Sequence, residues 1–503
     1  MGGFLDAILT VMQPYNLLAL VVGVALGSLF SAIPGLTSTL ALALLLPLTY
    51  SLPTDTAFVI MIGLMGGGLY GGMLTAITLN IPGAPGSVAT TFDGHPMFRN
   101  GQGGKAIGWA TISSIIGGVI SSIILAAGAL QLAKVALSFG PPEMFALTIF
   151  GMAAVISLNT DLTKSALAGI FGLILGTVGI DAFGDFRFHF GVNDLAGGMP
   201  LLPAVVGLFA LVKVFQAMNT SVDKPTISFS SAETADTRMR LPGVKSILKR
   251  WKTLLRGSLI GTFVGFLPGA GGNIAAFAAY NVEKRASRTP EKFGQGAEEG
   301  VIASESANNA TPGGSLIPTL TLGIPGDQFA AVMIGGFIIH GLPVGPLLFR
   351  DHVDIIYVIF VTTFLMNFLF LPIGWVGSMM AVPLARLRDT LLIPIIAAFS
   401  LAGLFAIAGT TSNILIALIF AIIGLAADRF GFPPAPLILG LILSSIMEDA
   451  MNQSLTLSGG DYSIFITHPI SACFLLAAIL FVLLPLVFDK RKAKKQQATR
   501  GLS

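Results

Sequence analysis

Two Pro-Gly pairs interrupt hydrophobic stretches of the chain, and both are followed by groups that can bind a small anion. Hydroxyl side chains follow Pro34-Gly35, whereas glycines and Asn273 follow Pro268-Gly269. A Pro-Gly break leaves backbone N–H groups without helical partners, and the positive end of the next half-helix attracts negative charge. The residues expected to contact an anion at these breaks are Pro34, Gly35, Thr37, Ser38, Thr39, Pro268, Gly269, Gly271, Gly272 and Asn273.

A single break of this kind is also explained by a proline kink or a glycine packing contact, both of which are common in membrane helices. Here the segment around Pro34 recurs 234 positions later around Pro268. Breaks in corresponding places of two halves of a membrane protein point to a binding site between the halves. We therefore favour a binding function for the matched pair.

A second pair of breaks lies in TLNIPG, at Thr78 to Gly83, and 243 positions later in TLGIPG, at Thr321 to Gly326. Carbonyl groups ahead of such breaks lose their helical partners and can coordinate a coupling cation. An ionisable group at these breaks, Asp327, is a candidate ligand of the coupling cation and a candidate N-cap of the next half-helix. The same carboxylate can have both roles. The predicted coupling-ion residues are Asn80, Pro82, Gly83, Gly323, Pro325, Gly326 and Asp327.

The stretch Ser304 to Gly314 is unusually polar for a segment that leads directly into a membrane helix. We expect Asn308, Asn309 and Thr311 to line the cavity and contact the anion; an exposed loop is the alternative. Asp93 and other acidic residues near predicted helix ends are interpreted as solvated caps in preference to a proton relay.

The elements that position these residues are membrane helices. Of 503 residues, 54% are hydrophobic and 11% are charged, and the mean hydropathy is +0.84, whereas soluble domains carry roughly 25% charged residues. One cysteine cannot form an internal disulfide, the five histidines show no metal-ligand spacing, and no Walker sequence is present. The composition therefore argues against a soluble catalytic domain, a metal enzyme and an ATP-driven pump.

The basic residues predict the topology, because cytoplasmic loops of membrane proteins are rich in Lys and Arg. The apolar segment Gly257 to Tyr280 has basic residues at both ends, which predicts a re-entrant hairpin whose arms, about 11 residues or roughly 16 Å each, are too short to cross. The corresponding segment Leu17 to Leu48 has uncharged or acidic flanks, so we expect it to enter from the opposite face. Further crossings are expected near Ala106–Leu130, Phe145–Leu158, Leu167–Ile180, Leu201–Phe215, Ile355–Val382, Leu391–Ala408, Ile414–Ala427, Pro434–Met447 and Ile470–Phe488.

The predicted fold is an all-α polytopic membrane protein with two inverted repeats, re-entrant hairpins and broken transmembrane helices. Its expected segments are a first membrane repeat at 1–218, a cytoplasmic basic loop at 219–256, a second repeat with a final helix at 257–488, and a cytoplasmic tail at 489–503.

Four long motifs resemble the large membrane subunit of tripartite tricarboxylate transporters, the TctA family. They lie at Ile33–Tyr50, Tyr70–Met97, Phe266–Ser287 and Ser304–Gly326. The resemblance implies a secondary active carrier in a bacterial inner membrane, with no cofactor, that uses a Na⁺ or H⁺ gradient. It also implies two partners, a small membrane subunit of about four helices and a periplasmic solute-binding protein that delivers citrate or a related carboxylate.

The residues themselves are consistent with such a carrier. Few intramembrane Arg or Lys residues are available to neutralise a multiply charged anion, so amides, hydroxyls and co-bound cations have to do so. We expect the hairpins and broken helices to move together against the other crossings, as in an elevator. One alternative is a passive anion channel. The other is an intramembrane aspartyl protease, because Gly326-Asp327 is similar to the Gly-Asp pairs of such enzymes, but the sequence has no convincing second aspartate in a matching helix.

Overall fold

The computed structural model describes residues 2–33, 36–157, 159, 161–181, 184–192, 195–219, 238–385, 389–408 and 411–483. Pro34, Gly35, residues 220–237 of the predicted central loop and the basic tail lie outside these residues. Within them the chain is overwhelmingly helical, and the strands are β1 (Gly179–Ile180) and β2 (Phe186–Arg187), which form an antiparallel pair. The prediction of an all-α protein is confirmed.

Six helical segments of the described chain are long and apolar enough to cross a membrane. They are Pro14–Ala32, Thr54–Leu79, Pro85–Ala136, Val353–Met380, Ser412–Phe430 and Pro434–Leu457. Several helices thus meet the length of about 20 apolar residues that a hydrocarbon core of roughly 30 Å requires, and the chain is a polytopic membrane protein.

The chain forms two compact units, and each takes segments from both halves of the sequence. Unit 1 comprises Met1–Ala136 and Val205–Ala421, and unit 2 comprises Leu137–Ala204 and Ile422–Ser503. Both predicted hairpins and both broken helices belong to unit 1. The units therefore do not follow the linear boundaries at 218 and 256.

The first half of unit 1 places a helix break on either side of one long helix. Its elements are α1 (Gly2–Met12), α2 (Pro14–Ala32), α3 (Ser38–Thr49), α4 (Thr54–Leu79), η1 (Pro85–Ser87), α5 (Val88–Met97), η2 (Phe98–Gln102) and α6 (Gly103–Ala136). The breaks separate α2 from α3 and α4 from η1, as the sequence predicts.

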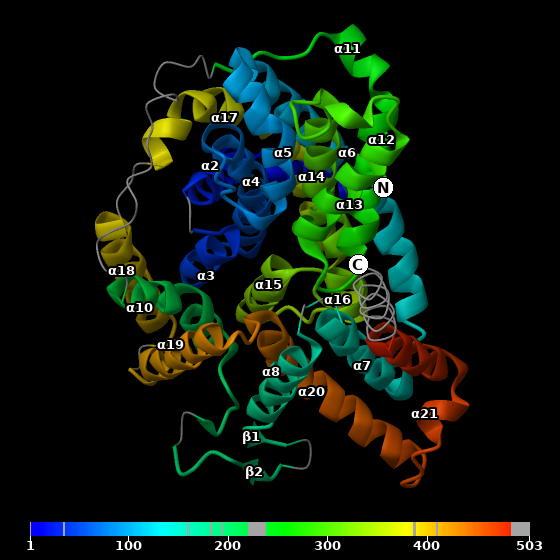
Figure 1. Cartoon of the computed structure of the whole chain (residues 1–503). Helices are drawn as coiled ribbons and strands as arrows, with labels where there is room; N and C mark the ends of the chain where they lie inside the picture. Colours follow the sequence, from blue (N-terminus) through cyan, green and yellow to red (C-terminus); the bar gives the residue numbers. More distant parts are fainter. Residues whose placement is uncertain are drawn as a thin grey trace, which may run out of the picture. The chain divides into compact units, whose positions relative to one another are not determined.

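The rest of unit 1 repeats this order around a second long helix. Its elements are η4 (Val206–Leu211), α10 (Val212–Asn219), α11 (Val244–Lys249), α12 (Trp251–Phe266), α13 (Gly271–Ala286), η5 (Pro290–Lys292), α14 (Glu298–Leu322), α15 (Gln328–Ile339), α16 (Pro346–Asp351), α17 (Val353–Ala385) and α18 (Asp389–Ala408). The breaks separate α12 from α13 and α14 from α15. Figure 1 shows α14 beside α12 and α13.

Unit 2 is held together by α20, which packs on α7 and α8. Its elements are α7 (Pro141–Ser157), α8 (Leu162–Gly176), β1, β2, α20 (Pro434–Leu457), α21 (Ile464–Thr467) and a helix at Pro469–Leu483. Two elements cross the unit boundaries, α9 (Leu201–Val205) and α19 (Ser412–Phe430). The predicted crossing Leu167–Ile180 is wrong at its end, because Gly179 has a positive φ of 117° and begins β1.

Backbone contacts at glycines hold α2 against α4 and α12 against α14. A side chain on Gly23 or Gly27 of α2 would collide with a carbonyl oxygen of α4, and one on Gly261 of α12 would collide with a carbonyl of α14. A side chain on Gly257 would collide with the Ser306 hydroxyl and lie 3.0 Å from the Ala303 carbonyl. Small residues allow such close approach in membranes, where lipid-exposed apolar surface gives little drive for helix association. The carbonyl groups near these glycines belong to Ile60, Leu64, Ala303 and Ala307. The glycines of α2 and α12 are 234 positions apart and the carbonyl residues of α4 and α14 are 243 apart, the same offsets that relate the two pairs of breaks.

Adding one methyl group at the contact between α12 and α14 is expected to destabilise the protein. In Gly261→Ala the new Cβ would overlap the Ala307 carbonyl oxygen, a backbone atom that cannot turn away, and overpacking typically costs about 1–3 kcal/mol. Gly128→Ala, on α6, is the control, because its Cβ would meet only the end of the Ile317 side chain at 3.6 Å. Thermal unfolding of the purified variants in detergent measures both; equal midpoints would contradict the packing argument.

Candidate functional site

The first break is shaped by the hydroxyl residues that follow it. Thr37 caps α3, since its Oγ1 accepts the Leu40 N–H at 3.1 Å. Ser38 packs against Gly68 of α4, and Thr39 is buried. These side chains fix the start of α3 on α4, although Pro34 and Gly35 themselves lie outside the described residues.

The corresponding break between α12 and α13 is hydrogen-bonded to the break between α14 and α15. Gly269 and Gly271 adopt positive φ values of 78° and 59°, and the Gly269 N–H donates to the Gly326 carbonyl at 2.8 Å. The Gly269 N–H is therefore used internally, contrary to the expectation that it is free. Pro268 is buried, whereas Asn273 is exposed.

The helices α12 and α13 have 16 residues each, more than the eleven predicted for a hairpin arm. The extra residues belong to charged ends, since α12 begins at Trp251 inside the predicted 219–256 loop and α13 continues through Lys284 and Arg285. A helix of 16 residues is about 24 Å long, still less than the hydrocarbon thickness of roughly 30 Å.

The second pair of breaks has the same backbone geometry in both halves. Helix α4 ends at Asn80 and α14 ends at Gly323, and these residues are left-handed with φ values of 57° and 72°. A side chain on Gly83 would collide with the Ser31 carbonyl, and one on Gly326 would meet the Gly265 carbonyl. Only glycine allows these approaches, so each later break is anchored on the end of the preceding hairpin arm.

The ionisable residue of these breaks has a structural role. The Asp327 carboxylate accepts the Ala330 N–H at 2.8 Å, which confirms its predicted N-cap role for α15. Its Cβ also lies near Gly271 at the start of α13. The Asn80 side chain is exposed, whereas Gly83, Pro325 and Gly326 are buried and Pro82 is half-buried.

The polar stretch Ser304 to Gly314 is part of α14 and is buried throughout, so the exposed-loop alternative is wrong. Pro312 has no N–H for the carbonyl of Asn308 one turn earlier. The Thr311 hydroxyl donates to that carbonyl at 2.7 Å instead. The Thr311 hydroxyl therefore replaces the helical hydrogen bond that is missing at Pro312. Its hydrogen is not free to be donated to an anion.

Asn308 joins elements from both halves of the chain. Its Nδ2 donates to the Leu69 carbonyl of α4 at 3.0 Å. Its Oδ1 is buried without a hydrogen-bond partner in the structure and faces the backbone of Gly86 in η1 and of Gly272 in α13. An unpaired buried acceptor is costly, and Asn309 Oδ1 is also unpaired. Asn308 is the better placed of the two, because its oxygen lies against the backbone of both η1 and α13.

A carboxylate that the sequence analysis did not single out lies one turn before Asn309. Glu305 is fully buried, with Oε1 accepting the Thr90 hydroxyl of α5 and Oε2 lying 3.2 Å from Asn309 Nδ2 and 3.3 Å from the Ser114 hydroxyl of α6. None of the ion pairs among the described residues includes Glu305. Its place as an ionisable residue within the polar stretch of a membrane protein is the signal that could have identified it.

The prediction that Asp93 is a solvated cap is wrong. Asp93 is fully buried, and its Oδ1 accepts the N–H groups of Gly294, Gly296 and Ala297 at 2.8–2.9 Å. The positive φ values of Gly294 and Gly296 turn this loop so that its amides converge. Asp93 therefore fastens α5 to the loop that precedes α14.

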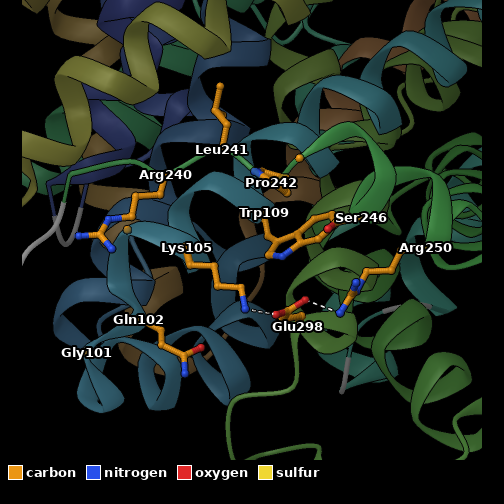
Figure 2. A pocket seen from close by; sticks show the side chains of 12 residues that line it. Gly101, Gln102, Lys105, Trp109, Arg240, Leu241, Pro242, Ser246, Arg250 and Glu298 are labelled. Atoms are coloured by element: carbon orange, nitrogen blue, oxygen red, sulfur yellow. Dashed lines mark ion pairs between the residues drawn. The ribbon is translucent and has the colours of Figure 1, made fainter.

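Basic residues distant in sequence gather at the same end of α6 and α14, around a cavity of about 520 Å³ (Figure 2). Lys105 and Arg250 both pair with Glu298, and the Arg250 guanidinium lies 5.0 Å from the centre of the Trp109 ring. The Arg240 N–H donates to the Gly104 carbonyl at 2.8 Å. The loops predicted to be cytoplasmic therefore meet at this end.

A family model for the tripartite tricarboxylate transporter TctA family matches residues 17–439. The chain belongs to this family. It is 35% identical over 497 residues to an uncharacterised 52.8 kDa protein of the TAR-I ttuC' 3' region of Agrobacterium vitis, with 96% of both chains covered. A protein of the TAR-II ttuC' 3' region of the same organism is 35% identical over 234 residues, which cover 46% of this chain and 97% of that protein. No solved structure matches.

Membership in the TctA family makes this chain a multi-pass membrane subunit of the tripartite tricarboxylate transporter type, and not an enzyme. The intramembrane protease alternative is thereby removed. The buried amides and the carboxylate between the helix breaks of this TctA-family protein are then the groups to examine for transport.

Replacing the Asp93 carboxylate by an amide is expected to destabilise the junction between α5 and α14. Asp93→Asn keeps the acceptor oxygen but removes the charge from three hydrogen bonds, and such charge-assisted bonds are worth about 1.5–3 kcal/mol each. A lower thermal unfolding midpoint is expected, against no change for Asp354→Asn, an exposed aspartate in the first turn of α17. A midpoint for Asp93→Asn equal to that of the unmodified protein would rule out this role.

Proposed function

We propose that this TctA-family protein is a secondary active carrier that takes up tricarboxylate or related carboxylate anions across a bacterial inner membrane. The observation that carries the proposal is Asn308, whose unpaired amide oxygen lies between η1 of one half and α13 of the other. The Asn308 amide, the adjacent backbone of Gly272 and the start of α13 form the anion site. The neighbouring residues Gly271 and Asn309 complete this anion site.

The two halves are inverted repeats in this proposal. The shared order of elements, the left-handed ends of α4 and α14, and the matching glycine contacts at offsets of 234 and 243 support it. The charge pattern supports the inversion, because the first hairpin has acidic or uncharged flanks and the second has basic flanks. A substrate site between two repeats at mid-membrane follows from that architecture.

Uptake is coupled to a Na⁺ or H⁺ gradient, and the binding protein and the small membrane subunit complete the transporter. The C-terminal tail lies in the cytoplasm. The hairpins and broken helices move as one body against the remaining crossings. Cross-links that fix these elements to the remaining crossings are expected to stop uptake; uptake that survives them would contradict this motion.

Radiolabelled citrate uptake into proteoliposomes tests the proposal. The vesicles contain this chain and its small membrane partner, with a matching binding protein outside and a sodium or proton gradient imposed or abolished. Accumulation that requires both the gradient and the binding protein is expected. Failure with every carboxylate tested under both gradients would refute the carrier, and uptake without any gradient would favour the channel.

Removing the Asn308 amide is expected to weaken substrate binding by about tenfold, which corresponds to roughly 1.4 kcal/mol for one lost hydrogen bond in a buried site. The measurement is the substrate concentration for half-maximal uptake by Asn308→Ala. Asn367→Ala is a matched control, because Asn367 is also fully buried and its Oδ1 is also unpaired and faces a glycine, Gly118 of α6. Equal effects of the two variants would mean that Asn308 has no special role in binding.

Two substitutions separate the cap role of Asp327 from ion binding. Asn is as good an N-cap as Asp, whereas Ala costs about 1 kcal/mol, so Asp327→Asn should keep the unfolding midpoint that Asp327→Ala lowers. If Asp327 is a coupling-ion ligand, Asp327→Asn still requires a higher cation concentration for half-maximal uptake. An unchanged cation dependence in Asp327→Asn would leave Asp327 as a cap only.

A further inference from the structure

We propose that Glu305 binds and releases a proton during the transport cycle. This inference rests on the proposed carrier function and adds a site to it. The glutamate is the eighth of the 25 residues of α14, one turn before the amides of Asn308 and Asn309, and is fully buried. Its ligand is a proton, taken up from water on one side of the membrane and released to water on the other.

The partners of Glu305 distinguish it from the other buried glutamates of the described chain. Glu283 of α13 pairs with Arg256 at 2.7 Å, and Glu143 of α7 lies 2.9 Å from the ring of His468. Glu305 is surrounded by hydroxyl and amide groups instead. A carboxylate that is removed from water without a cation is strongly disfavoured in its charged form, so protonation is the simplest way to neutralise it.

The hydrogen bonds around Glu305 leave room for that proton. Ser114 has one hydroxyl hydrogen, and two acceptors lie within its reach, the Ala110 carbonyl at 2.8 Å and Glu305 Oε2 at 3.3 Å. The Ser114 oxygen also accepts the Asn309 Nδ2–H at 2.8 Å. When the hydrogen is donated to Ala110, the nearer acceptor, a lone pair of Ser114 faces Glu305 Oε2. A protonated Oε2 can donate to that lone pair, whereas an ionised Oε2 places two acceptors opposite each other.

Among the described residues, no ion pair joins a Lys, Arg or His side chain to Glu305. The titratable groups that face it are Tyr70 of α4, bonded to Thr111 of α6 at 2.8 Å, and Asp93 of α5 with Tyr280 of α13 beside it. Oδ1 of Asp93 accepts three backbone N–H groups, whereas its Oδ2 has no hydrogen-bond partner in the structure. Of these two described carboxylates, Glu305 is the one that accepts no backbone N–H group.

Protonation at Glu305 reaches the anion site through its hydrogen-bond partners. Thr90 lies on α5, directly beyond the break at η1, and donates to Oε1. Asn309 is adjacent to Asn308, and its Nδ2 is shared between Ser114 and Oε2. Loss of the proton changes which of these bonds form, and thereby the position of α5 and of the two amides relative to each other.

The test is transport by Glu305→Gln, which keeps the shape and a neutral donor but cannot release a proton. Sodium is held equal on both sides while a pH gradient is imposed, and citrate accumulation is compared with citrate exchange between equal concentrations. The expected result is that the variant no longer accumulates citrate in response to the pH gradient but still exchanges it. Glu283→Gln, another buried glutamate, is the control and should keep the response to the pH gradient.

Infrared difference spectroscopy gives a readout that does not depend on transport. A pH step on the purified unmodified protein should change a carboxylic-acid C=O band that is absent in Glu305→Gln and retained in Glu283→Gln. The inference is overturned if Glu305→Gln still accumulates citrate under a pH gradient, if the unmodified protein transports citrate without response to that gradient, or if no band is lost. Absence of all citrate transport in the unmodified protein would instead count against the proposed function, and the infrared band would still decide whether Glu305 titrates.

Discussion

Backbone groups that are buried in a membrane protein have no water to bind, and this constraint governs how the helix breaks of the chain are built. Each break exposes N–H and carbonyl groups that another part of the protein has to satisfy or enclose. The Gly269 N–H is satisfied by the Gly326 carbonyl, and Gly83 and Gly326 lie directly against the carbonyls of Ser31 and Gly265. Because a side chain at these glycines would collide with backbone, the breaks hold one another in position.

Helix α14 connects these breaks to each other. It carries Pro312, which removes one helical hydrogen bond, and Thr311, whose hydroxyl replaces the missing donor. One turn earlier Asn308 reaches the backbone of α4, η1 and α13. A single helix thus contacts parts of both halves, which is the arrangement needed for a ligand at the centre to sense or change their relative position.

The buried polar groups fall into two classes. Oδ1 of Asp93 accepts three backbone amides, and Glu283 pairs with Arg256, so these carboxylates stabilise particular junctions. Asn308 keeps an unpaired oxygen, and Glu305 belongs to no ion pair of the described residues. Polar groups of the second class are costly in a membrane, and a protein that transports charged solutes has a use for them.

The sequence by itself determined the class of the protein, the four breaks and their recurrence, because hydrophobic length and Pro-Gly chemistry are local properties. It also indicated the cap at Asp327 and the polar stretch that contains Asn308. Only the tertiary structure decided that Asp93 is buried, that the Gly269 N–H is already bonded, and that Glu305 belongs to no ion pair of the described residues. The partners in these cases come from segments up to about two hundred residues away, such as Asp93 with Gly294 or Glu305 with Thr90. No local pattern encodes such contacts, since burial and pairing of a charge depend on which helices pack together.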